Sequence, residues 1–182
     1  MMAFFLFYVP IIIFVASPGA AAAAAAEPEM RQTKSESAVL QKKTVLLLHG
    51  AKFSDKDWER IGTLDKIKEV GFEAVAVNLH TDQLWNKDHL AWMEAKIKEI
   101  EGKVVIVAPS MSGRGAVPYV LKHPEVFGFI PIAPAIDPRD LPKDNSVSVR
   151  TLVMYGQYDG PGKAVSEHLL KVFKDPVKVE IA

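Results

Sequence analysis

The sequence predicts an α/β domain in which helices cover both faces of a mostly parallel sheet, giving three layers. Three observations predict it: short apolar stretches recur after residue 43, segments with helical spacing separate them, and a serine follows one stretch at a strand-to-helix turn. The stretches are mostly rich in Val and Ile and nearly continuous, which is typical of strands buried on both faces. Strands that alternate with helices favour a parallel sheet.

Five apolar stretches each predict one buried strand. They are residues 45–48, 74–77, 104–107, 129–132 and 152–155. A sixth candidate strand, Val177–Ile181, runs to the C-terminal end of the sequence. No repeat of fixed period is visible, so the pattern does not indicate a solenoid.

Helices are predicted between these strands from the spacing of apolar residues. Apolar positions recur in a charged background at residues 61–70 and again at residues 92–100. A third helix is predicted over residues 113–122, where a His-Pro pair ends it, and a fourth over residues 163–173 after a Gly-Pro-Gly entry. No helix is predicted after the sixth strand, so the α/β domain is expected to lack the last helix of this architecture.

The composition excludes several classes of protein. The chain has 182 residues, of which 49% are apolar, and it carries 22 basic and 22 acidic side chains. This length and composition predict one globular domain and exclude a largely disordered chain. A net charge of zero gives no reason to expect nucleic acid as a partner. Because the sequence contains no cysteine, it can hold neither a disulfide, a thiol nucleophile nor a Cys-ligated metal.

The first 30 residues differ from the rest of the chain because they contain no Lys or Arg. Residues 3–16 form one apolar run, which as a helix would rise about 21 Å, short of the roughly 30 Å hydrocarbon core of a bilayer. That length is typical of the apolar region of a signal peptide, and the alanines at residues 20–26 contain several A-x-A cleavage frames. The basic residues that usually precede this apolar region are missing. Two alternatives for residues 1–26 therefore stay open: an uncleaved membrane anchor, or an extension without a targeting role.

These features divide the chain into three parts. Residues 1–26 are expected to be a signal peptide or an N-terminal membrane anchor, residues 27–43 a polar linker, and residues 44–182 the folded domain. The expected location is therefore secreted, within the endomembrane system, or anchored to a membrane through the N-terminal segment alone. If that segment has no targeting role, the protein is expected in the cytoplasm.

The residues after the third predicted strand are candidates for chemistry, because ligands bind at the carboxyl ends of parallel strands. There Ala108 and Pro109 lead into Ser110, and the next residues open a helix. A serine on such a tight turn has the geometry of a nucleophile elbow, in which small flanking residues let the turn close. The small residues here are Ala108 and Ser112 instead of the usual glycines. A plain helix N-cap stays open as the alternative role of Ser110.

Two further segments favour a nucleophilic serine. His49 and Gly50 follow the first strand, where a loop can offer the N–H of Ala51 as one oxyanion donor and the residue after the nucleophile, Met111, offers the other. In this interpretation His49 supports the loop and is not the base. Asp159 follows the fifth strand, where a carboxylate can orient a histidine and stabilise its charged form. An aspartate that only shapes a Gly-rich turn stays open for Asp159.

At these residues the chain resembles the α/β-hydrolase-domain-containing protein 14 family. The resemblance rests on VLLLHGAKFSDKDWERIGTL, VVIVAPSMSG and VMYGQYDGPG, and it runs from about Thr44 to the end. It implies an α/β-hydrolase fold with Ser110 as nucleophile and Asp159 as the acid of a catalytic triad. It also implies a hydrolase whose substrates are small acyl esters or amides, or acylated lysines of proteins. One member of the family is a lysine deacylase that passes the acyl group to coenzyme A, so coenzyme A stays open as an acyl acceptor here. No other cofactor is expected, and the sequence does not indicate an oligomeric state.

The histidine of a Ser–His–Asp triad is missing at the place where the resemblance implies it. That place is a Gly-Ala-Gly-His loop and terminal helix after the last strand, whereas here only Ala182 follows Val177–Ile181. Of the five histidines, His80 lies at the expected edge of the sheet and stays open as a base, while His168 is expected on a helix flank. We therefore expect either a truncated or variant serine hydrolase, or a catalytically inactive relative that acts by binding.

Two other classes of site are weakly indicated. The spacing G-x-G-x-x-P from Gly113 to Pro118 is similar to a dinucleotide fingerprint, but it follows the third strand and ends in proline. A metal site would need a cluster of ligands, and the nearest candidate is the single pair His80 and Asp82. We therefore expect no metal and no dinucleotide cofactor. The aromatic segment at residues 85–93 is expected to be core or the wall of a substrate pocket.

Overall fold

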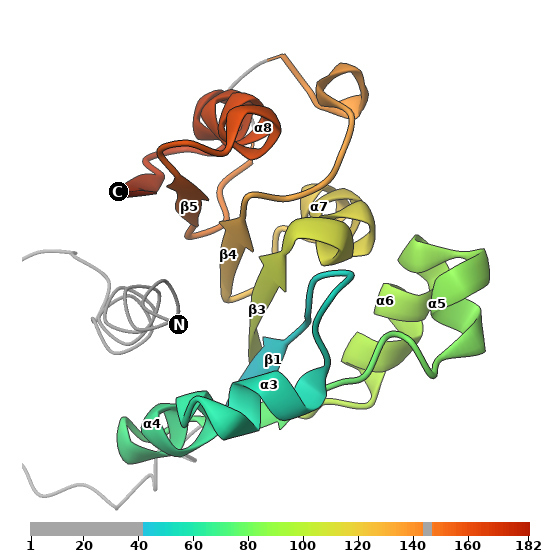
Figure 1. Cartoon of the computed structure of the whole chain (residues 1–182). Helices are drawn as coiled ribbons and strands as arrows, with labels where there is room; N and C mark the ends of the chain where they lie inside the picture. Colours follow the sequence, from blue (N-terminus) through green and yellow to red (C-terminus); the bar gives the residue numbers. More distant parts are fainter. Residues whose placement is uncertain (1–41, 144–146) are drawn as a thin grey trace, which may run out of the picture.

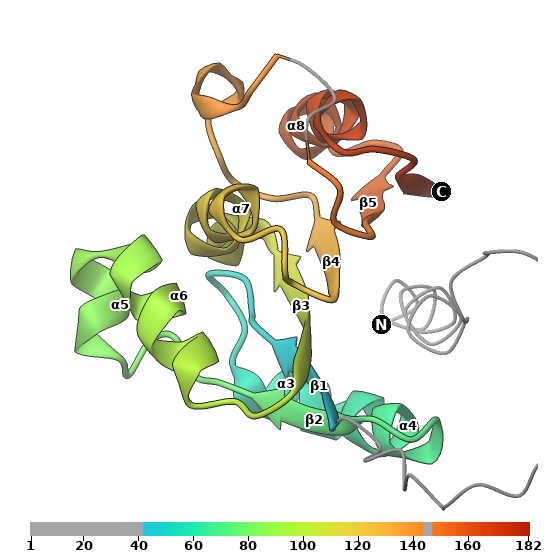
Figure 2. The same ribbon diagram turned by 180° about the vertical axis from the view of Figure 1, so that it is seen from behind.

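The computed structural model describes residues 42–143 and 147–182, and within them the chain forms a six-stranded sheet flanked by helices (Figures 1 and 2). The strand order is β2-β1-β3-β4-β5-β6, and each neighbouring pair is parallel. This confirms the α/β fold with a parallel sheet. The expected signal peptide or anchor lies outside the described residues, and β1 begins one residue before the expected start of the domain.

All six predicted strands are present; β6 has the predicted bounds, and the ends of the others shift by at most two residues. They are β1 (Lys43–Leu47), β2 (Glu73–Ala76), β3 (Lys103–Pro109), β4 (Gly128–Ile132), β5 (Leu152–Gly156) and β6 (Val177–Ile181). The longest is β3, which continues as far as Pro109, where it pairs with Ile132 of β4. β3 and β4 are almost entirely buried, as their continuous apolar sequences predict.

The helices depart more from the prediction. They are α3 (Asp55–Arg60), α4 (Thr63–Glu69), α5 (Gln83–Lys87), α6 (His89–Lys98), α7 (Gly113–Lys122) and α8 (Gly160–Val172), with 3-10 turns η1 (Ser110–Ser112) and η2 (Pro138–Asp140). The helix predicted over residues 61–70 is confirmed as α4, whereas α3, which precedes that range, was not predicted. Gly62 has a φ of 76°, a left-handed conformation that ends α3 and begins α4. The short α5 was not predicted; Asp82 caps it through the N–H groups of Leu84 and Trp85.

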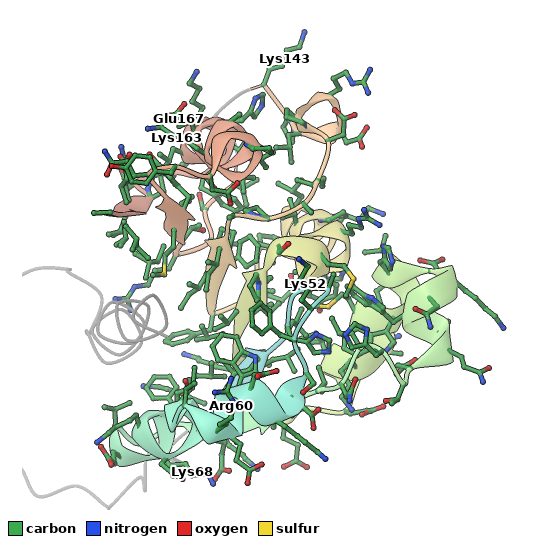
Figure 3. All side chains as sticks on the ribbon, viewed as in Figure 1. Lys52, Arg60, Lys68, Lys143, Lys163 and Glu167 are labelled. Carbon is green, nitrogen blue, oxygen red and sulfur yellow. The ribbon has the colours of Figure 1, made fainter. Side chains whose placement is uncertain are left out.

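Two apolar cores lie on the two faces of the sheet. Helices α5, α6, α7 and α8 contribute to the first core, and α3 and α4 contribute to the second. Trp85, Trp92 and Met93 are buried in the first core, so the aromatic segment at residues 85–93 belongs to the core. Charged side chains lie outside these layers; Figure 3 shows Lys68 and Lys143 pointing away from the molecule at opposite ends. None of the described helices is long and apolar enough to cross a bilayer.

The sheet has a topological switch point between β1 and β3. The chain adds β2 on one side of β1 and then crosses to add β3 on the other side. In open parallel sheets such a point leaves a crevice at the carboxyl ends of the two strands, where ligands bind. The residues at this edge are those of the loop after β1 and Ser110, which follows β3.

Candidate active site

Ser110 occupies a sharp turn between β3 and α7. Its φ is 49°, in the left-handed region that non-glycine residues seldom adopt, and it lies directly after Pro109, the last residue of β3. The residue is exposed, whereas the strand before it is buried. A strained backbone of this kind costs about 1–3 kcal/mol and persists only where the surrounding structure holds it. The turn therefore has the geometry of a nucleophile elbow.

Ser112 explains how this turn closes without the usual glycine. Its side chain is fully buried, and its hydroxyl donates a hydrogen bond of 2.8 Å to the carbonyl of Pro109. The hydroxyl thus satisfies a backbone acceptor at the end of β3 that the turn leaves free. A small polar residue at this position binds the turn to the strand, so Ser112 has a structural contact and Ser110 remains exposed.

The loop after β1 lies against Ser110. A Cβ atom added to Gly50 would stand 3.4 Å from the Cβ of Ser110, so a larger residue at Gly50 would fill the space beside the serine. The next residue, Ala51, is exposed, and within the described part of the chain its N–H donates to no backbone acceptor. The N–H of Met111 lies in the first turn after Ser110, where helical N–H groups lack partners within the helix. Met111 therefore follows Ser110 directly and Ala51 follows the residue that lies against it, while neither of the two lines the cleft described below.

His49 fixes the loop after β1 and has no free ring nitrogen. Its Nε2 accepts a hydrogen bond of 2.8 Å from the N–H of Leu79, and its Nδ1 donates one of 2.8 Å to the carbonyl of Gly50. The ring is therefore in the neutral form with its proton on Nδ1. Burial lowers the pKa of His49 from its ordinary value of 6.5. These contacts agree with a supporting role for His49.

Asp159 lies at the start of α8 and lines the same cleft as Ser110. Its Oδ1 accepts a hydrogen bond of 3.1 Å from the N–H of Gly162, so Asp159 is the N-cap of the helix. A side chain at Gly162 would overlap the Asp159 carboxylate and would stand 2.7 Å from the Cβ of Ala133. The glycine therefore lets α8 begin close to the segment after β4, which aims the Asp159 carboxylate along the edge of the sheet.

A cleft of about 740 Å³ opens beside Ser110 and Asp159. Its walls are one face of α7, the segment after β4, and the first turns of α8. The sequence analysis missed the contribution of α7 and of the segment after β4, including Arg114, Ile136 and Asp140. The rule that ligands bind at the carboxyl ends of strands, applied to β4 as well, would have indicated residues 133–137.

The five histidines all lie within the described residues, and none of them lines this cleft. His80 Nε2 donates a hydrogen bond of 2.9 Å to the carbonyl of Phe53. His168 Nε2 donates to the carbonyl of Pro142 at 3.2 Å and so joins α8 to the segment after η2. His123 lies at the C-terminal cap of α7, as predicted, and stacks on a tyrosine. His89, which begins α6, stacks against Trp85 and is half-buried.

Both basic and acidic side chains line the cleft. Arg139, which lies beside the cleft, pairs with Asp137 and holds the pKa of that carboxyl at about 2. Arg114 and Asp140 also line the cleft, and within the described residues neither makes a hydrogen bond or ion pair through its side chain. The charge of Arg114 adds to burial in lowering the pKa of His89. The cleft therefore offers the cation of Arg114 and the carboxylates of Asp140 and Asp159, and the charge of Asp140 also acts on Arg139.

The two alternative sites have structural explanations. The described residues contain no group of three or more His, Cys, Asp or Glu side chains placed to hold a metal ion. In the G-x-G spacing, a Cβ on Gly113 would overlap Pro134, and one on Gly115 would stand 2.8 Å from both the carbonyl of His89 and the ring of Trp85. These glycines let α7 approach its neighbours closely, so the spacing is accounted for by packing.

The parallel sheet, the elbow after β3 and the cleft at the carboxyl ends of β3, β4 and β5 define an α/β-hydrolase fold. Solved structures agree. The chain superimposes with a TM-score of 0.57 on a protein described as a predicted CIB-like hydrolase from Thermoplasma acidophilum, at 17% identity and over 79% of this chain and 78% of that one. It also superimposes on AbyA5 with a TM-score of 0.59, at 13% identity and over 78% of this chain and 54% of that one.

Curated relatives identify the family more narrowly. The chain is 32% identical over 141 residues to a protein of Rattus norvegicus named "Putative protein-lysine deacylase ABHD14B", and 32% identical over 126 residues to Protein ABHD14A of Homo sapiens. The matches cover 69% and 63% of this chain, and 66% and 46% of those relatives. No family model matches the sequence. The chain belongs to the α/β-hydrolase-domain-containing protein 14 family, and its match spans about two thirds of ABHD14B.

Proposed function

We propose that this chain is a serine hydrolase that cleaves small acyl esters or amides, including acyl-lysine. Ser110 is the nucleophile, Asp159 the acid of the triad, and the N–H groups of Ala51 and Met111 the oxyanion donors. The observation that carries the proposal is the exposed Ser110 at a φ of 49°, beside a cleft that also contains Asp159. Its relatives add support, because ABHD14B bears the name of a lysine deacylase and the superimposed archaeal protein that of a hydrolase.

The chemistry follows from these positions. The Ser110 hydroxyl attacks the acyl carbon, its proton passes to a base, and the new oxyanion receives hydrogen bonds from the two N–H groups. Asp159 orients the base and stabilises its positive charge. Collapse of this intermediate breaks the C–O or C–N bond of the substrate, and the base passes its proton to the leaving alcohol or amine. Water then attacks the acyl-serine, which releases the carboxylic acid and restores the Ser110 hydroxyl. Coenzyme A does not fit the cleft as the acceptor, because the lining contains three aspartates against one arginine, whereas the phosphates of coenzyme A are anionic.

No residue is assigned as the general base of this mechanism. None of the five histidines lines the cleft, so the residues of this sequence leave Ser110 without an evident proton acceptor. A serine hydroxyl without a base is a weak nucleophile, and removal of a triad member costs several orders of magnitude in rate. This observation favours a second candidate function, a catalytically inactive member of the family that binds acyl compounds in the same cleft.

A fluorophosphonate probe, which reacts with activated serines, separates the two functions. The proposal expects covalent labelling of the full chain that disappears in Ser110→Ala, with the label on the peptide that contains Ser110. Ser112→Ala is the matched control, because Ser112 is buried in the same turn and its hydroxyl contacts the carbonyl of Pro109. Labelling that persists in Ser112→Ala on the peptide that contains Ser110, at a rate lowered by the loss of the hydrogen bond to Pro109, supports the assignment. If circular dichroism shows that the wild-type chain is folded and the probe does not label it, the hydrolase is excluded and the binding function is favoured.

For residues 1–26 we propose a signal peptide or membrane anchor, on the basis of their apolar run and alanine tract. N-terminal sequencing of the protein from a eukaryotic expression host tests this. A start within the alanine tract is expected for a signal peptide, and a membrane-bound protein that begins at Met1 is expected for an anchor. A water-soluble protein that keeps Met1 would contradict both and favour the cytoplasm.

A further inference from the structure

Two unpaired charges of opposite sign face the cleft from different elements. Arg114 comes from α7, one helical turn after Ser110, and Asp140 comes from η2 in the segment after β4. Neither side chain makes a hydrogen bond or an ion pair within the described residues, and they do not pair with each other. The other carboxylate on this segment, Asp137, is occupied by Arg139. A ligand in the cleft therefore meets the cation of Arg114 and the carboxylates of Asp140 and Asp159, of which Asp159 already caps α8 and Asp140 stands across from Arg114 on another element.

The size of the cleft matches a ligand that carries both charges. In a free amino acid the carboxylate and the ammonium lie about 3 Å apart, and two charge-assisted hydrogen bonds of about 3 Å each bring the span to about 9 Å. A sphere with the volume of this cleft, about 740 Å³, would be about 11 Å across. A single anion would face repulsion from Asp140, and a single cation would face repulsion from Arg114, whereas a zwitterion satisfies both.

The remaining lining is apolar and extends along the same wall as Ser110. Pro118 and Leu121 follow Arg114 on the cleft-facing side of α7, and Val165 of α8 also lines the cleft. Such a surface suits the methylene stem of a long side chain. The stem of lysine has four methylenes, which separate an amide on its side-chain nitrogen from the charged groups on its α-carbon. An acyl amide at Ser110 and a charged head at Arg114 and Asp140 then fit one molecule.

We propose that the cleft binds free amino acids acylated on the side chain, of the Nε-acyl-lysine class, with Arg114 on the α-carboxylate and Asp140 on the α-ammonium. This inference rests on the proposed function in taking Ser110 as the residue that meets the acyl amide. It differs from a lysine within a protein, whose α-groups are neutral peptide bonds and offer no charge to either residue.

Binding to Ser110→Ala protein tests the inference without turnover. Calorimetric titration compares Nε-acetyl-lysine with the same compound blocked as an Nα-acetyl amide, which mimics a residue inside a peptide. The free amino acid is expected to bind at least about 10-fold more tightly, since two charge-assisted hydrogen bonds distinguish the two ligands. Equal affinities, tighter binding of the blocked compound, or no binding of either compound would overturn the inference.

Variants locate the selectivity at the two residues. Arg114→Gln and Asp140→Asn, each added to Ser110→Ala, are expected to abolish the preference for the free amino acid and to leave binding of the blocked compound within about 2-fold. Lys143→Gln and Glu167→Gln are the matched controls for charge, because Lys143 extends away from the molecule and Glu167 lies on the outer side of α8 (Figure 3). Selectivity that survives both cleft variants, or that falls equally in the controls, overturns the assignment. If the Ser110→Ala protein binds the free amino acid selectively but the fluorophosphonate probe does not label the wild type, the proposed hydrolase function is refuted and the proposed ligand class stands.

Discussion

The backbone carbonyl of Ser110 accepts a hydrogen bond of 2.7 Å from the N–H of Ala135. This bond joins the elbow after β3 to the segment after β4, which forms another wall of the cleft. Both segments contain a non-glycine residue with positive φ, Ser110 at 49° and Ala133 at 43°. Each strained residue is thus held by the element beside it, and the position of Ser110 depends on the packing of α7 against Pro134 and Ala135.

Gly113→Ala is expected to disturb this contact. A Cβ at Gly113 would overlap Pro134 and stand 3.2 Å from the N–H nitrogen of Ala135, so the segment after β4 must move away from the elbow. Overpacking of this kind costs about 1–3 kcal/mol, against about 1 kcal/mol gained by replacing glycine with alanine in a helix. Urea unfolding is expected to show a lower free energy of unfolding, and labelling by the fluorophosphonate probe is expected to slow.

The control for this variant is Gly160→Ala at the start of α8, where a Cβ would meet no atom within 4 Å. This substitution is expected to leave the labelling rate close to that of the wild type and to raise the free energy of unfolding by at most about 1 kcal/mol. Equal stabilities of the Gly113→Ala and Gly160→Ala proteins would contradict the close packing of the elbow against the segment after β4.

Substitutions of Asp159 are expected to separate its structural and chemical roles. Asparagine caps helices about as well as aspartate, so Asp159→Asn keeps the hydrogen bond to the N–H of Gly162, whereas Asp159→Ala loses a cap worth about 1 kcal/mol. If Asp159 is the triad acid, both variants lose reactivity at Ser110, because the neutral amide cannot stabilise a charged base. Thermal unfolding and probe labelling measure the two roles. A fully reactive Asp159→Asn protein would leave Asp159 as a cap only.

The sequence predicted the sheet better than the helices or the cleft, and the reasons are physical. Continuous Val- and Ile-rich stretches have few alternatives to a buried strand, so all six strands lie within two residues of their predicted bounds. The helices that the sequence did not indicate, α3 and α5, have six and five residues and bury one side chain each, Trp58 and Trp85, so no apolar spacing marks them. The cleft depends on contacts between distant segments, such as Ser110 with Ala135, which no local pattern contains.

The stability of the fold is expected to decrease with acid because of His49. Burial lowers its pKa in the folded protein, while the unfolded chain protonates near 6.5. Above that pH both states carry a neutral ring and His49 adds no pH dependence. As the pH falls below 6.5, the unfolded state takes up a proton that the folded state resists, so the free energy of unfolding decreases until the lowered pKa is reached. Urea unfolding at about pH 7.5 and about pH 5.5 measures this decrease.

His49→Gln is expected to weaken this pH dependence. The variant loses the hydrogen bond from the N–H of Leu79 to Nε2, so it is also less stable at the higher pH. Part of the slope should remain, because burial lowers the pKa of His89 as well, and His49→Gln/His89→Gln should reduce it further. An unchanged difference between the two pH values in His49→Gln would exclude His49 as its source.

Exogenous imidazole is expected to raise the rate of ester hydrolysis if Ser110 is the nucleophile and none of the five histidines serves as its base. The cleft of about 740 Å³ beside Ser110 has room for the ring, and Asp159 lines the same space to receive its N–H. Hydrolysis of p-nitrophenyl acetate, corrected for imidazole alone, is expected to rise about 10-fold or more and to saturate. Because only neutral imidazole can accept the Ser110 proton, the effect should grow from about pH 6 to about pH 8. Ser110→Ala should abolish it and Asp159→Asn should reduce it, whereas equal stimulation of all three proteins would mean that Ser110 has no catalytic role.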